Sequence, residues 1–543
     1  MAALGARAAD DWARVDPAAI KHWQDLRFGM FIHWGPVSLT AHEIGWSRGA
    51  QTPIEKYDNL YKEFNPTNFT ADEWVAIAKA AGMKYMVLTT KHHDGFCLWN
   101  TKLTDYNIMN SPFHRDVVKE LSEACKKGGI AFGTYYSVTD WYDKNWPVTS
   151  PAGKVKRDKP DIDAYEKYLQ GQITELITGY GPLLTIWNDV PAMYGKERGA
   201  RTINMVRKLQ PDITINNRTG AGGDYNTPEQ RVGGFDIDHP WESCMTISAH
   251  NAWAWGGDKD GVKPLEKCIS MLANCAGGDG NILLNVGPRP DGKIAPEQVA
   301  RLKDIGEWMK KNGESICGTR GGPFKPAKDF TSTRKGSTIY LHFIGERREV
   351  KLPAIPVAIK SAKVTCGAEV DLKDEADGAK MVTIKGDCLD DVDNVVVLEM
   401  AGDAMSIAPV AVEGGASGGS ATAGKATASV VFGGNYEADK AFDGDAETRW
   451  ATPGGTHAAW IAIELPAAKK ISCALVQQDA SYADRIEAYE FQCEENGAWK
   501  TLCSGEKIAA QGRLVFDPVT AKKFRLNITK ANEGPTINEI VLK

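Results

Sequence analysis

The sequence predicts a multidomain protein in which a (β/α)8-like TIM barrel precedes two smaller all-β domains. Residues 1–325 alternate short apolar runs with amphipathic stretches, and residues 326–402 hold only short strand-like runs. Residues 403–426 include the Gly/Ser/Ala-rich stretch Gly414–Gly424, which is typical of a flexible linker, and residues 427–543 are again strand-rich. A barrel takes about 250 residues, so a chain of 543 residues accommodates it with two further domains.

The first domain is predicted from the order of its elements. Six short apolar runs have strand character: Phe28–Trp34, Tyr85–Thr89, Ala131–Tyr136, Leu183–Trp187, Ile213–Asn216 and Asn281–Val286. Amphipathic stretches have helical character: Ala71–Ala81, Asp116–Lys127, Asp163–Thr178 and Pro296–Asn312. Alternating β and α units imply a parallel sheet, and this many units favour its closure into a barrel. A doubly wound open sheet is rejected because the glycine-rich stretch Gly220–Gly223 does not match a dinucleotide fingerprint.

The second domain consists of short strand-like runs with no helical stretch between them. These runs are Thr338–Ile344, Glu349–Leu352, Ala362–Cys366, Met381–Ile384 and Val395–Met400. Short runs bounded by turn residues predict a small antiparallel β-sandwich.

Composition and charge exclude several classes of protein. The 64 basic and 70 acidic residues give a net charge of −6, which offers no electrostatic basis for binding nucleic acid. The 11 cysteines form no C-x-x-C pair, so neither a zinc ribbon nor a thioredoxin-like site is expected. No apolar run approaches the roughly 18 residues of a membrane span. Residues Met1–Ala9 lack the apolar core of an export signal, which leaves export undecided.

Polar and aromatic residues follow the predicted barrel strands. Barrel enzymes place their catalytic groups at the C-terminal ends of the strands. In chain order, these ends carry His33 and Trp34, then His92, His93 and Asp94, then Tyr135 and Tyr136, then Asp189, and finally Glu242 after the short run Phe235–Trp241. One such residue alone is more often a core group or a helix cap, but five strand ends in register indicate a site at the barrel mouth.

Asp189 and Glu242 are the two carboxylates of this set that suit the hydrolysis of a glycosidic bond. That reaction needs one carboxylate to attack the anomeric carbon and another to protonate the leaving oxygen. The aromatic and apolar neighbours of Glu242, in the stretch HPWESC, are of the kind that raise a carboxyl pKa, as an acid catalyst requires. The structural alternatives are an N-cap role for Asp189 and a surface position for Glu242.

Six separated motifs in the first domain resemble those of glycoside hydrolase family 29, the α-L-fucosidases. In order they are WQDLRFGMFIHW (23–34), KHHDGF (91–96), GTYYS (133–137), IWND (186–189), WESCMTI (241–247) and GNILLNVGPRPDG (280–292). The resemblance covers about residues 20–320, and NGESIC (312–317) resembles the segment that closes the family's barrel.

This resemblance implies an exo-acting, retaining α-L-fucosidase that works by double displacement, with Asp189 as nucleophile and Glu242 as acid/base. Four positions would hold hydroxyls of the terminal fucose: His33, His92, His93 and Tyr135. Trp46 and Trp99 are candidates for a wall against the C5 methyl group, with plain core packing as the alternative. No cofactor is needed for this chemistry, and the expected partner is a fucosylated oligosaccharide or glycan.

The chain departs from the family's pattern beside the expected site. Many members have an aromatic residue before the nucleophile and glycine after it, where this chain has Asn188 and Val190. Many also have glutamate directly before Trp46, where this chain has Gly45. Two alternatives therefore stay open: a glycosidase for a galactose-configured or sulfated relative of fucose, and a glycan-binding protein that has lost turnover.

The third domain resembles the discoidin-like, coagulation-factor type C fold, a β-sandwich of jelly-roll type found in many bacterial carbohydrate-binding modules. The motifs that carry this resemblance are KAFDGDAETRW (440–450), WIAIEL (460–465) and INEIVL (537–542). The family often holds a structural calcium, and the matching ligands here are Asp443, Asp445 and Glu539. Family members of this modular build usually act in the bacterial periplasm or on the cell surface, so we expect the same location.

Overall fold

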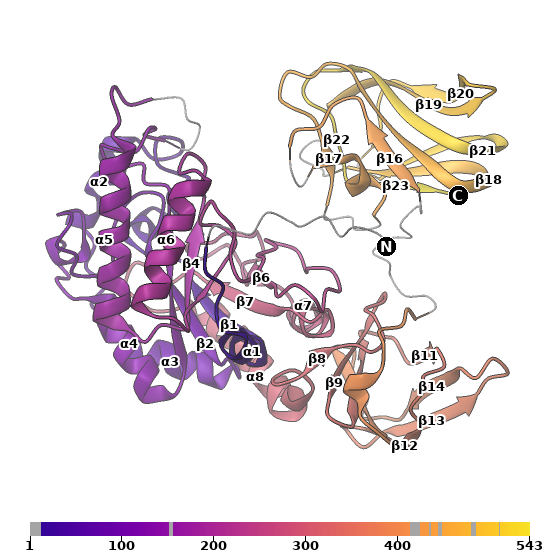
Figure 1. Cartoon of the computed structure of the whole chain (residues 1–543), viewed down its shortest axis with the longest axis horizontal. Helices are drawn as coiled ribbons and strands as arrows, with labels where there is room; N and C mark the ends of the chain where they lie inside the picture. The colour runs from indigo at the N-terminus through magenta and orange to yellow at the C-terminus, as the bar shows by residue number, and fades with distance from the viewer. Residues whose placement is uncertain are drawn as a thin grey trace, which may run out of the picture. The chain divides into compact units, whose positions relative to one another are not determined.

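The computed structural model describes residues 12–150, 156–412, 424–433, 436–443, 448–478, 485–509 and 511–543 (Figure 1). These residues form two compact units. The first unit comprises the described residues up to Lys325 together with Asp329–Ala411, and the second comprises Pro326–Lys328 and the described residues from Val412 onward. In the part of the chain that the structure describes, no helix is both long and apolar enough to cross a membrane.

A seven-stranded parallel sheet forms the centre of the first unit. Its order is β5-β4-β3-β2-β1-β7-β6, and every neighbouring pair is parallel. The strands are β1 (Phe28–Ile32), β2 (Tyr85–Lys91), β3 (Ala131–Ser137), β4 (Thr185–Asp189), β5 (Thr214–Ile215), β6 (Glu242–Thr246) and β7 (Asn281–Val286). The predicted alternation of β and α units is confirmed, with one correction: the strand near Trp241 begins at Glu242 rather than ending before it.

Both edges of this sheet meet the same irregular segment. Parallel bridges join Asn216, just after β5, to Tyr225, and join Glu229 to Cys244 on β6. The backbone N–H of Glu242 donates to the carbonyl of Asn226 at 2.9 Å, which extends the contact with β6. Residues 225–229 therefore lie between the two edge strands.

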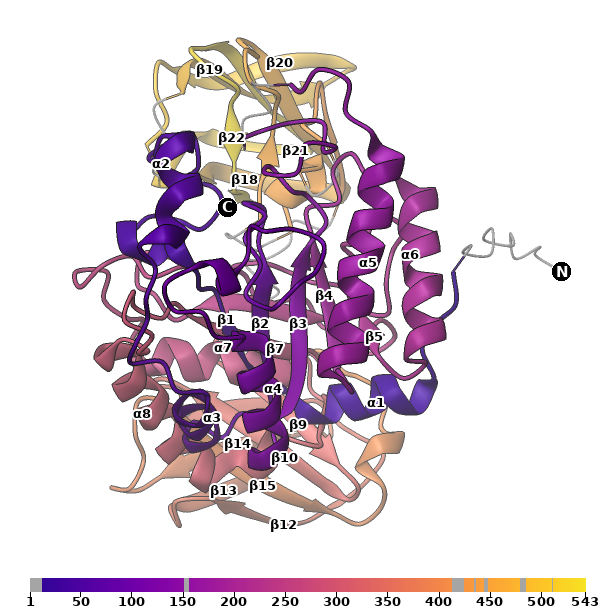
Figure 2. The ribbon, with the colours of Figure 1, turned by 90° about the vertical axis from the view of Figure 1, so that its left-hand side faces the viewer.

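Helices cover the outer face of the sheet (Figure 2). They are α3 (Ala71–Ala80), α4 (Val117–Gly128), α5 (Ile162–Tyr180), α6 (Lys196–Leu209), α7 (Leu265–Gly277) and α8 (Pro296–Asn312). Helix α1 (Pro17–Leu26) instead packs Trp23 into the inside of the sheet, and α2 (Ile54–Asn59) lies in the connection between β1 and β2. The four predicted helical stretches correspond to α3, α4, α5 and α8. Helix α4 shows why such stretches end where they do: the Asp116 side chain caps its first turn, and Gly129 at φ 70° closes its last.

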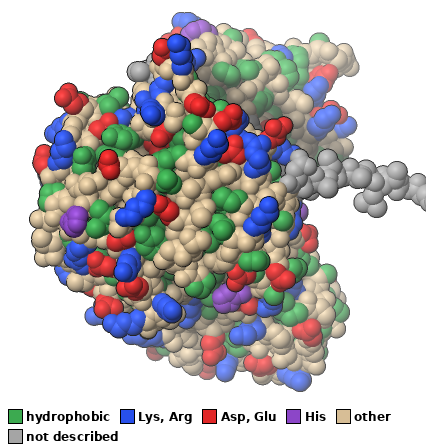
Figure 3. Space-filling model, turned by 60° about the vertical axis from the view of Figure 1, so that its left-hand side comes forward, with side chains coloured by type: hydrophobic (Ala, Val, Ile, Leu, Met, Phe, Trp, Pro, Cys, Tyr) green, Lys and Arg blue, Asp and Glu red, His purple; other side chains and the backbone are tan. Residues whose placement is uncertain are grey.

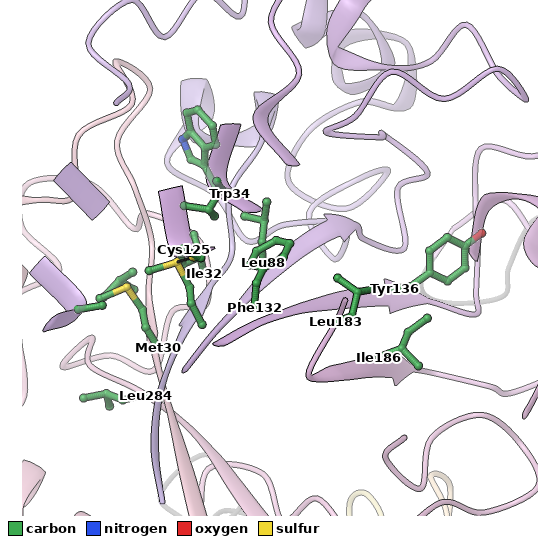
Figure 4. Packing of buried hydrophobic residues seen from close by; sticks show 14 of the residues in the cluster. Met30, Ile32, Trp34, Leu88, Cys125, Phe132, Tyr136, Leu183, Ile186 and Leu284 are labelled. Carbon is green, nitrogen blue, oxygen red and sulfur yellow. Dashed lines mark hydrogen bonds between the residues drawn. The ribbon is translucent and has the colours of Figure 1, made fainter. Parts of the chain in front are cut away.

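Successive strand residues pack on opposite faces of the sheet. Phe31, Tyr85, Tyr135 and Trp187 form part of an inner cluster. Their neighbours pack outward against the helices, as Figure 4 shows for Ile32, Tyr136 and Ile186. Both faces of the sheet are buried, and its strands carry continuous apolar runs such as Phe28–Ile32 and residues 85–88, as is usual for a parallel sheet covered by helices. The inner cluster therefore lies directly beneath the polar residues at the C-terminal ends of the strands.

Two small antiparallel sheets follow in the same unit, in the region where the sequence predicts a sandwich. One sheet has the order β12-β15-β10-β9-β8 and the other β11-β14-β13. The strands are β8 (Arg320–Gly321), β9 (Phe330–Lys335), β10 (Thr338–Ile344), β11 (Glu349–Leu352), β12 (Ile359–Val364), β13 (Glu369–Asp374), β14 (Lys380–Lys385) and β15 (Asp393–Met400). Thr365 Oγ1 donates to Asn312 Oδ1 at 2.8 Å, so this β-region contacts the end of α8.

The second unit is all-β, as the sequence predicts. Its larger sheet runs β16-β18-β21-β19-β20, with β23 also paired to β18, and a separate pair joins β17 to β22. The strands are β16 (Lys425–Ala428), β17 (Trp450–Ala451), β18 (Ala459–Gln477), β19 (Ile486–Glu495), β20 (Ala498–Gly505), β21 (Gln511–Ala531), β22 (Thr536–Ile537) and β23 (Glu539–Leu542). Trp450, Phe491 and Phe524 lie in its core.

Charged side chains of both signs are interspersed on the face of the molecule shown in Figure 3. This mixture agrees with the near balance of 64 basic and 70 acidic residues, and no field of one sign dominates that face.

Candidate active site

Asp189 is the last residue of β4, where the sequence predicts it. Tyr135, near the end of the neighbouring β3, donates its hydroxyl to Asp189 Oδ2 at 2.8 Å. Arg218 Nη1 donates to Asp189 Oδ1 at 2.9 Å, and His93 Nε2 lies 3.7 Å from Oδ2. Only 13% of the Asp189 side chain is exposed. Both carboxylate oxygens thus accept hydrogen bonds, and only a small part of the carboxylate remains exposed to solvent.

Arg218 and Glu229 complete this site, and the sequence prediction missed both. Arg218 follows β5, and its Nη1 also donates to Glu229 Oε2 at 2.8 Å. Since the same nitrogen lies 2.9 Å from Asp189 Oδ1, this oxygen and Glu229 Oε2 are at most about 5.7 Å apart, which is compatible with the roughly 5.5 Å typical of retaining glycosidases. Arg218 is anchored in turn by Thr227, whose hydroxyl and carbonyl accept from Nε and Nη2. Glu229 is 43% exposed, so solvent reaches it.

The three predicted histidines gather beside Asp189. The His92 ring lies 5.6 Å from the His33 ring, 3.9 Å from the His93 ring and 5.4 Å from the Tyr135 ring, all between centroids. His33 Nδ1 pairs with Asn285 Oδ1 at 2.6 Å, and His93 Nδ1 pairs with Ser137 Oγ at 2.6 Å. The structure therefore brings together residues from β1, β2, β3 and β4 that the sequence spreads over 150 positions or more.

Burial sets the charge of this cluster. It lowers the pKa of His33 to about 3 and the pKa of His93 to about 4, and it lowers the pKa of His92 well below its usual value. Burial alone would raise the pKa of Asp189, but the charges of Arg218 and His93 and the hydrogen bonds from Arg218 and Tyr135 outweigh it and lower that pKa. At neutral pH the site thus holds an ionised Asp189 among neutral imidazoles.

Glu242 does not lie at the C-terminal edge of the sheet. It is the first residue of β6, it is completely buried, and its side chain points into the inner cluster below the site. Its Oε1 accepts from Trp187 Nε1 at 3.1 Å, and its Oε2 accepts from the Tyr85 hydroxyl. Burial raises the pKa of Glu242 to about 7, although these two hydrogen bonds lower it in part. The predicted elevated pKa is present, but the predicted position at the barrel mouth is wrong.

The two predicted tryptophans differ in position. Trp46 is 44% exposed, and its ring lies 5.3 Å from both the His93 and the Trp141 ring centroids, so it stands at the rim of the site. Trp99 is fully buried, and its Nε1 donates to Glu175 Oε2 on α5 at 3.0 Å. Trp99 therefore packs in the outer core, the alternative that the sequence left open, and does not line the site.

Trp253 is a further aromatic residue near the site that the sequence prediction missed. Its ring centroid lies 4.9 Å from that of His33, and its carbonyl accepts from Asn285 Nδ2 at 2.7 Å. The backbone N–H groups of Trp253 and Ala254 donate to the Glu43 carboxylate at 2.9 and 3.1 Å. Glu43 therefore holds this loop, while Gly45 occupies the place before Trp46.

The departures from the family's pattern have different consequences. Asn188 faces away from the site: its Nδ2 donates to Thr219 Oγ1 at 3.0 Å on the outer side of β4. Val190 adopts φ 43°, a left-handed conformation that a β-branched residue rarely takes and that glycine takes freely. Gly45 has φ 65°, and a Cβ there would come within 2.6 Å of His92 Nδ1. Only the positions of Val190 and Gly45 thus bear directly on the site.

The predicted calcium ligands lie in the second unit and are described in part. The Asp443 carboxylate accepts from Thr448 Oγ1 at 2.9 Å, and Glu539 is buried in β23. Asp445 lies outside the described residues. Among the residues that the structure describes, no group of three or more histidine, cysteine or acidic side chains is arranged to hold a metal ion.

Two carboxylates on one arginine, at the C-terminal edge of a parallel sheet and beside aromatic rings, are the arrangement of a glycoside hydrolase. Comparison with known proteins narrows this class. The family model for alpha-L-fucosidase matches residues 4–314, and the model for the F5/8 type C domain matches residues 425–541. The chain therefore belongs to the α-L-fucosidases of glycoside hydrolase family 29 and carries a discoidin-like domain C-terminal to the fucosidase domain.

Individual relatives agree with this assignment. Human tissue alpha-L-fucosidase is 30% identical over 410 residues, which cover 68% of this chain and 86% of that protein. Alpha-L-fucosidase isoenzyme 1 from Paenibacillus thiaminolyticus is 32% identical with a TM-score of 0.64, covering 70% of this chain and 98% of that one. A GH29 alpha-L-fucosidase from Bacteroides thetaiotaomicron, trapped as a covalent intermediate with 2-fluoro-fucosyl fluoride, is 27% identical with a TM-score of 0.65, covering 74% and 100%.

Proposed function

We propose that the protein is an exo-acting, retaining α-L-fucosidase that releases terminal α-linked L-fucose from oligosaccharides and glycans. The observation that carries this proposal is the bridge from Arg218 to both Asp189 and Glu229, which brings two carboxylates close enough to act on one anomeric carbon, and this supports a double displacement. Because only 13% of the Asp189 side chain is exposed, the site suits a single terminal sugar better than a chain passing through it.

In the first step, Asp189 Oδ1 or Oδ2 attacks the anomeric carbon and the bond from that carbon to the glycosidic oxygen breaks. The lowered pKa of Asp189 keeps it ionised and ready to attack. Glu229, in its protonated form, gives its proton to the departing oxygen. In the second step, Glu229 takes a proton from water, the water oxygen attacks the anomeric carbon, and fucose leaves Asp189.

We assign the acid/base role to Glu229 in place of Glu242. A general acid must reach the leaving group and exchange protons with water. Glu229 is 43% exposed and shares an arginine with Asp189. Glu242 is completely buried, and both of its carboxylate oxygens accept hydrogen bonds from core residues. The raised pKa of Glu242 follows from that burial and does not require a catalytic role.

The neutral histidines are well suited to bind sugar hydroxyls. A neutral imidazole can donate from one nitrogen and accept at the other, which matches a hydroxyl group. His92 Nδ1 has no hydrogen-bond partner in the described structure, although the atom is buried. In this proposal His33, His92 and His93 hold the fucose hydroxyls together with Tyr135. Trp46 offers an apolar face at the rim for the C5 methyl group.

Several further expectations belong to this proposal. The parallel sheet acts as a (β/α)8-like barrel in which residues 225–229 serve as the eighth strand, and their bridges to both edges support this. A calcium ion held by Asp443, Asp445 and Glu539 supports the discoidin-like domain. The domain keeps the enzyme close to polymeric glycan and raises the local substrate concentration. We place the protein in the periplasm or outside the cell.

The first test is hydrolysis of an aryl α-L-fucoside by the wild type, Asp189→Asn and Glu229→Ala. Asp189→Asn should lose turnover while remaining folded by circular dichroism. Glu229→Ala should lose far more rate on glycosides with poor leaving groups than on activated aryl fucosides. Azide needs no general base, so it should restore turnover of Glu229→Ala on the activated substrate. Rescue of Glu242→Ala alone would return the acid/base role to Glu242.

The alternative of an altered sugar preference is motivated by Gly45, which lies against His92 at a position where many members of the family have glutamate. A panel of aryl glycosides distinguishes the two functions. A strong preference for the α-L-fucoside supports the proposal, and preference for a galactose-configured or sulfated substrate supports the alternative. A folded wild type that binds these glycosides without hydrolysing any of them would indicate a binding protein.

A further inference from the structure

Glu242 is a buried acid that the mechanism above does not use. Its side chain lies in the inner cluster, and its two oxygens accept from different strands: Oε1 from Trp187 on β4 and Oε2 from Tyr85 on β2. The distance from Trp187 Nε1 to Oε1 is 3.1 Å. An indole has one hydrogen-bond donor, and a buried donor without an acceptor is costly. Glu242 thus fixes the direction in which the Trp187 N–H points.

The ring of Trp187 contacts both groups that hold the nucleophile. Tyr135 stacks on it with centroids 5.6 Å apart and planes at 18°, and the Tyr135 hydroxyl donates to Asp189. The Arg218 guanidinium carbon lies 4.8 Å from the Trp187 ring centroid, and Arg218 bridges Asp189 and Glu229. A rotation of the Trp187 ring would therefore displace the tyrosine and the arginine together.

We propose that Glu242 is a positioning residue, which orients Trp187 so that Tyr135 and Arg218 hold Asp189 and Glu229 at their working separation. The proposal rests on the roles assigned above to Asp189 and Glu229. In this proposal the residue that fixes the geometry of the site lies in the inner cluster, one layer of side chains below the reacting atoms. A small displacement of reacting groups can cost roughly 100-fold in rate, so a residue that never touches substrate can still control turnover.

The test compares Glu242→Leu with Glu242→Gln. Leucine has a similar shape but no acceptor, whereas glutamine keeps an acceptor for Trp187 and a donor for the Tyr85 oxygen. We expect Glu242→Leu to lower kcat by up to roughly 100-fold with a smaller change in KM. We expect Glu242→Gln to retain most of the rate. Equal losses in both variants, or none in Glu242→Leu, would overturn the proposal.

A pH profile separates positioning from a merely structural role. The acidic limb of kcat/KM reports the pKa of the free enzyme's essential base. Because Tyr135 and Arg218 lower the pKa of Asp189, their displacement in Glu242→Leu should move this limb to higher pH. Tyr85→Phe is the matched control: it removes the other donor to Glu242, so it should lower stability without moving the limb. Equal limbs in Glu242→Leu and the wild type would contradict the proposal.

Two further measurements keep the test independent of folding and of substrate. Trp187→Phe removes the same N–H while keeping an aromatic ring, so it must move the acidic limb as Glu242→Leu does even if the latter fails to fold. The near-ultraviolet circular dichroism of Trp187 needs no turnover. If no fucoside is hydrolysed, the proposed function fails, but Glu242→Leu should still lose the band that Trp187→Phe loses. An unchanged band would refute the positioning role.

A separate observation concerns two cysteines in the region of the two small antiparallel sheets. Strands β13 and β14 pair in an antiparallel register that sets Glu369 opposite Lys385. Cys366 lies in the turn before β13 and Cys388 in the turn after β14, and a Cβ on Gly386 would lie 3.3 Å from Ala368 Cβ, so the two turns are adjacent. Cys388 Sγ lies 3.3 Å from the Cys366 carbonyl oxygen, and both residues are exposed.

We infer that Cys366 and Cys388 form a reversible disulfide between the two turns under oxidising conditions. A disulfide needs Cβ atoms about 3.5–4.5 Å apart, and the Cys388 sulfur already contacts the Cys366 backbone at 3.3 Å, so a side-chain rotation with a small turn movement can bring the sulfurs together. One thiolate attacks oxidised glutathione and releases one reduced glutathione. The second thiolate then attacks the mixed disulfide and releases another. Two thiol protons and two electrons thus pass to the oxidant, and the bond closes a loop around the β13–β14 hairpin.

Peptide mapping of the full chain after treatment with oxidised glutathione tests this inference. The expected product is a Cys366–Cys388 linked peptide pair that dithiothreitol separates, with a higher melting temperature for the oxidised protein. Cys366→Ser is the control, since its Cys388 can form only a mixed disulfide with glutathione and its melting temperature should not rise. Free thiols or separate glutathione adducts at both positions of the oxidised wild type would overturn it.

Discussion

Tyr135 donates its hydroxyl to Asp189 Oδ2 across 2.8 Å, so the end of β3 directly stabilises the ionised carboxylate at the end of β4. A hydrogen bond to a charged group contributes about 1.5–3 kcal/mol, and here it favours the ionised form. The parallel register explains why these two residues are close: Ser137 pairs with Asp189 and Tyr135 pairs with Trp187.

Tyr135→Phe should therefore narrow the pH range of activity from the acidic side. Loss of the hydrogen bond raises the pKa of Asp189, so a larger fraction of the enzyme is protonated and inactive at low pH. The acidic limb of kcat/KM should move upward by about one pH unit or more. Tyr136→Phe is the control on the same strand, because its hydroxyl bonds Gln172 on the outer face. Coincident acidic limbs in the two variants would contradict this account.

Gly45→Ala should impair the site through His92. A Cβ at position 45 would lie 2.6 Å from His92 Nδ1, so the imidazole must move, and φ 65° adds backbone strain. We expect KM for the fucoside to rise at least about tenfold, since His92 is placed to bind a hydroxyl. Gly49→Ala has similar strain at φ 76°, but its nearest contact is the Ile54 side chain at 3.1 Å, and no site residue is among its neighbours. If both variants lose stability and only Gly45→Ala loses affinity, the contact with His92 is the cause.

Val190→Gly should stabilise the fold. Strain of this kind costs about 1–3 kcal/mol, whereas glycine loses about 0.5–1 kcal/mol through unfolded-state entropy. Because Val190 has φ 43°, its replacement by glycine should raise the free energy of unfolding of the protein by up to about 1–2 kcal/mol. Urea unfolding measures this, and Val190→Ala, which removes the β-branch but keeps the strained backbone, should gain less. A less stable Val190→Gly would show that the backbone at 190 is not strained.

The sequence predicted those candidate site residues that lie at or near the ends of regular strands. His33, His92, His93, Tyr135 and Asp189 end or directly follow strands whose apolar runs are legible, and parallel strands bring such ends to one edge. Arg218 and Glu229 could not be found in this way, because they lie in residues 216–230, where isolated bridges replace a regular strand. No periodicity marks such a segment. The signal that could have found them is their charge, although Asp224 in the same segment and Arg231 just after it are charged as well.

Glu242 was misplaced for a related reason. The apolar residues before it suggested a strand that ends at Trp241, but pairing begins at Glu242, opposite Asn281. Because Glu242 begins β6 instead of following its strand, it lies at the N-terminal edge of the parallel sheet and not at the C-terminal edge. The apolar surroundings that suggested an acid catalyst are real, and they are the packing of the inner cluster around a buried carboxyl.

The buried Glu242 also predicts how stability depends on pH. Burial raises its pKa to about 7 in the folded protein, above the value near 4.5 of the unfolded chain. The folded state thus retains a proton that the unfolded state releases, so the contribution of Glu242 to stability is fully present below pH 4.5 and is lost as the pH rises through 7. Glutamine has no such proton. The free energy of unfolding of the wild type, relative to Glu242→Gln, should therefore fall by roughly 3 kcal/mol between pH 4.5 and pH 8. Urea unfolding of both proteins across this range measures the difference, in which the titration of all other groups cancels. A constant difference would show that Glu242 titrates alike in both states and is not held protonated by its burial.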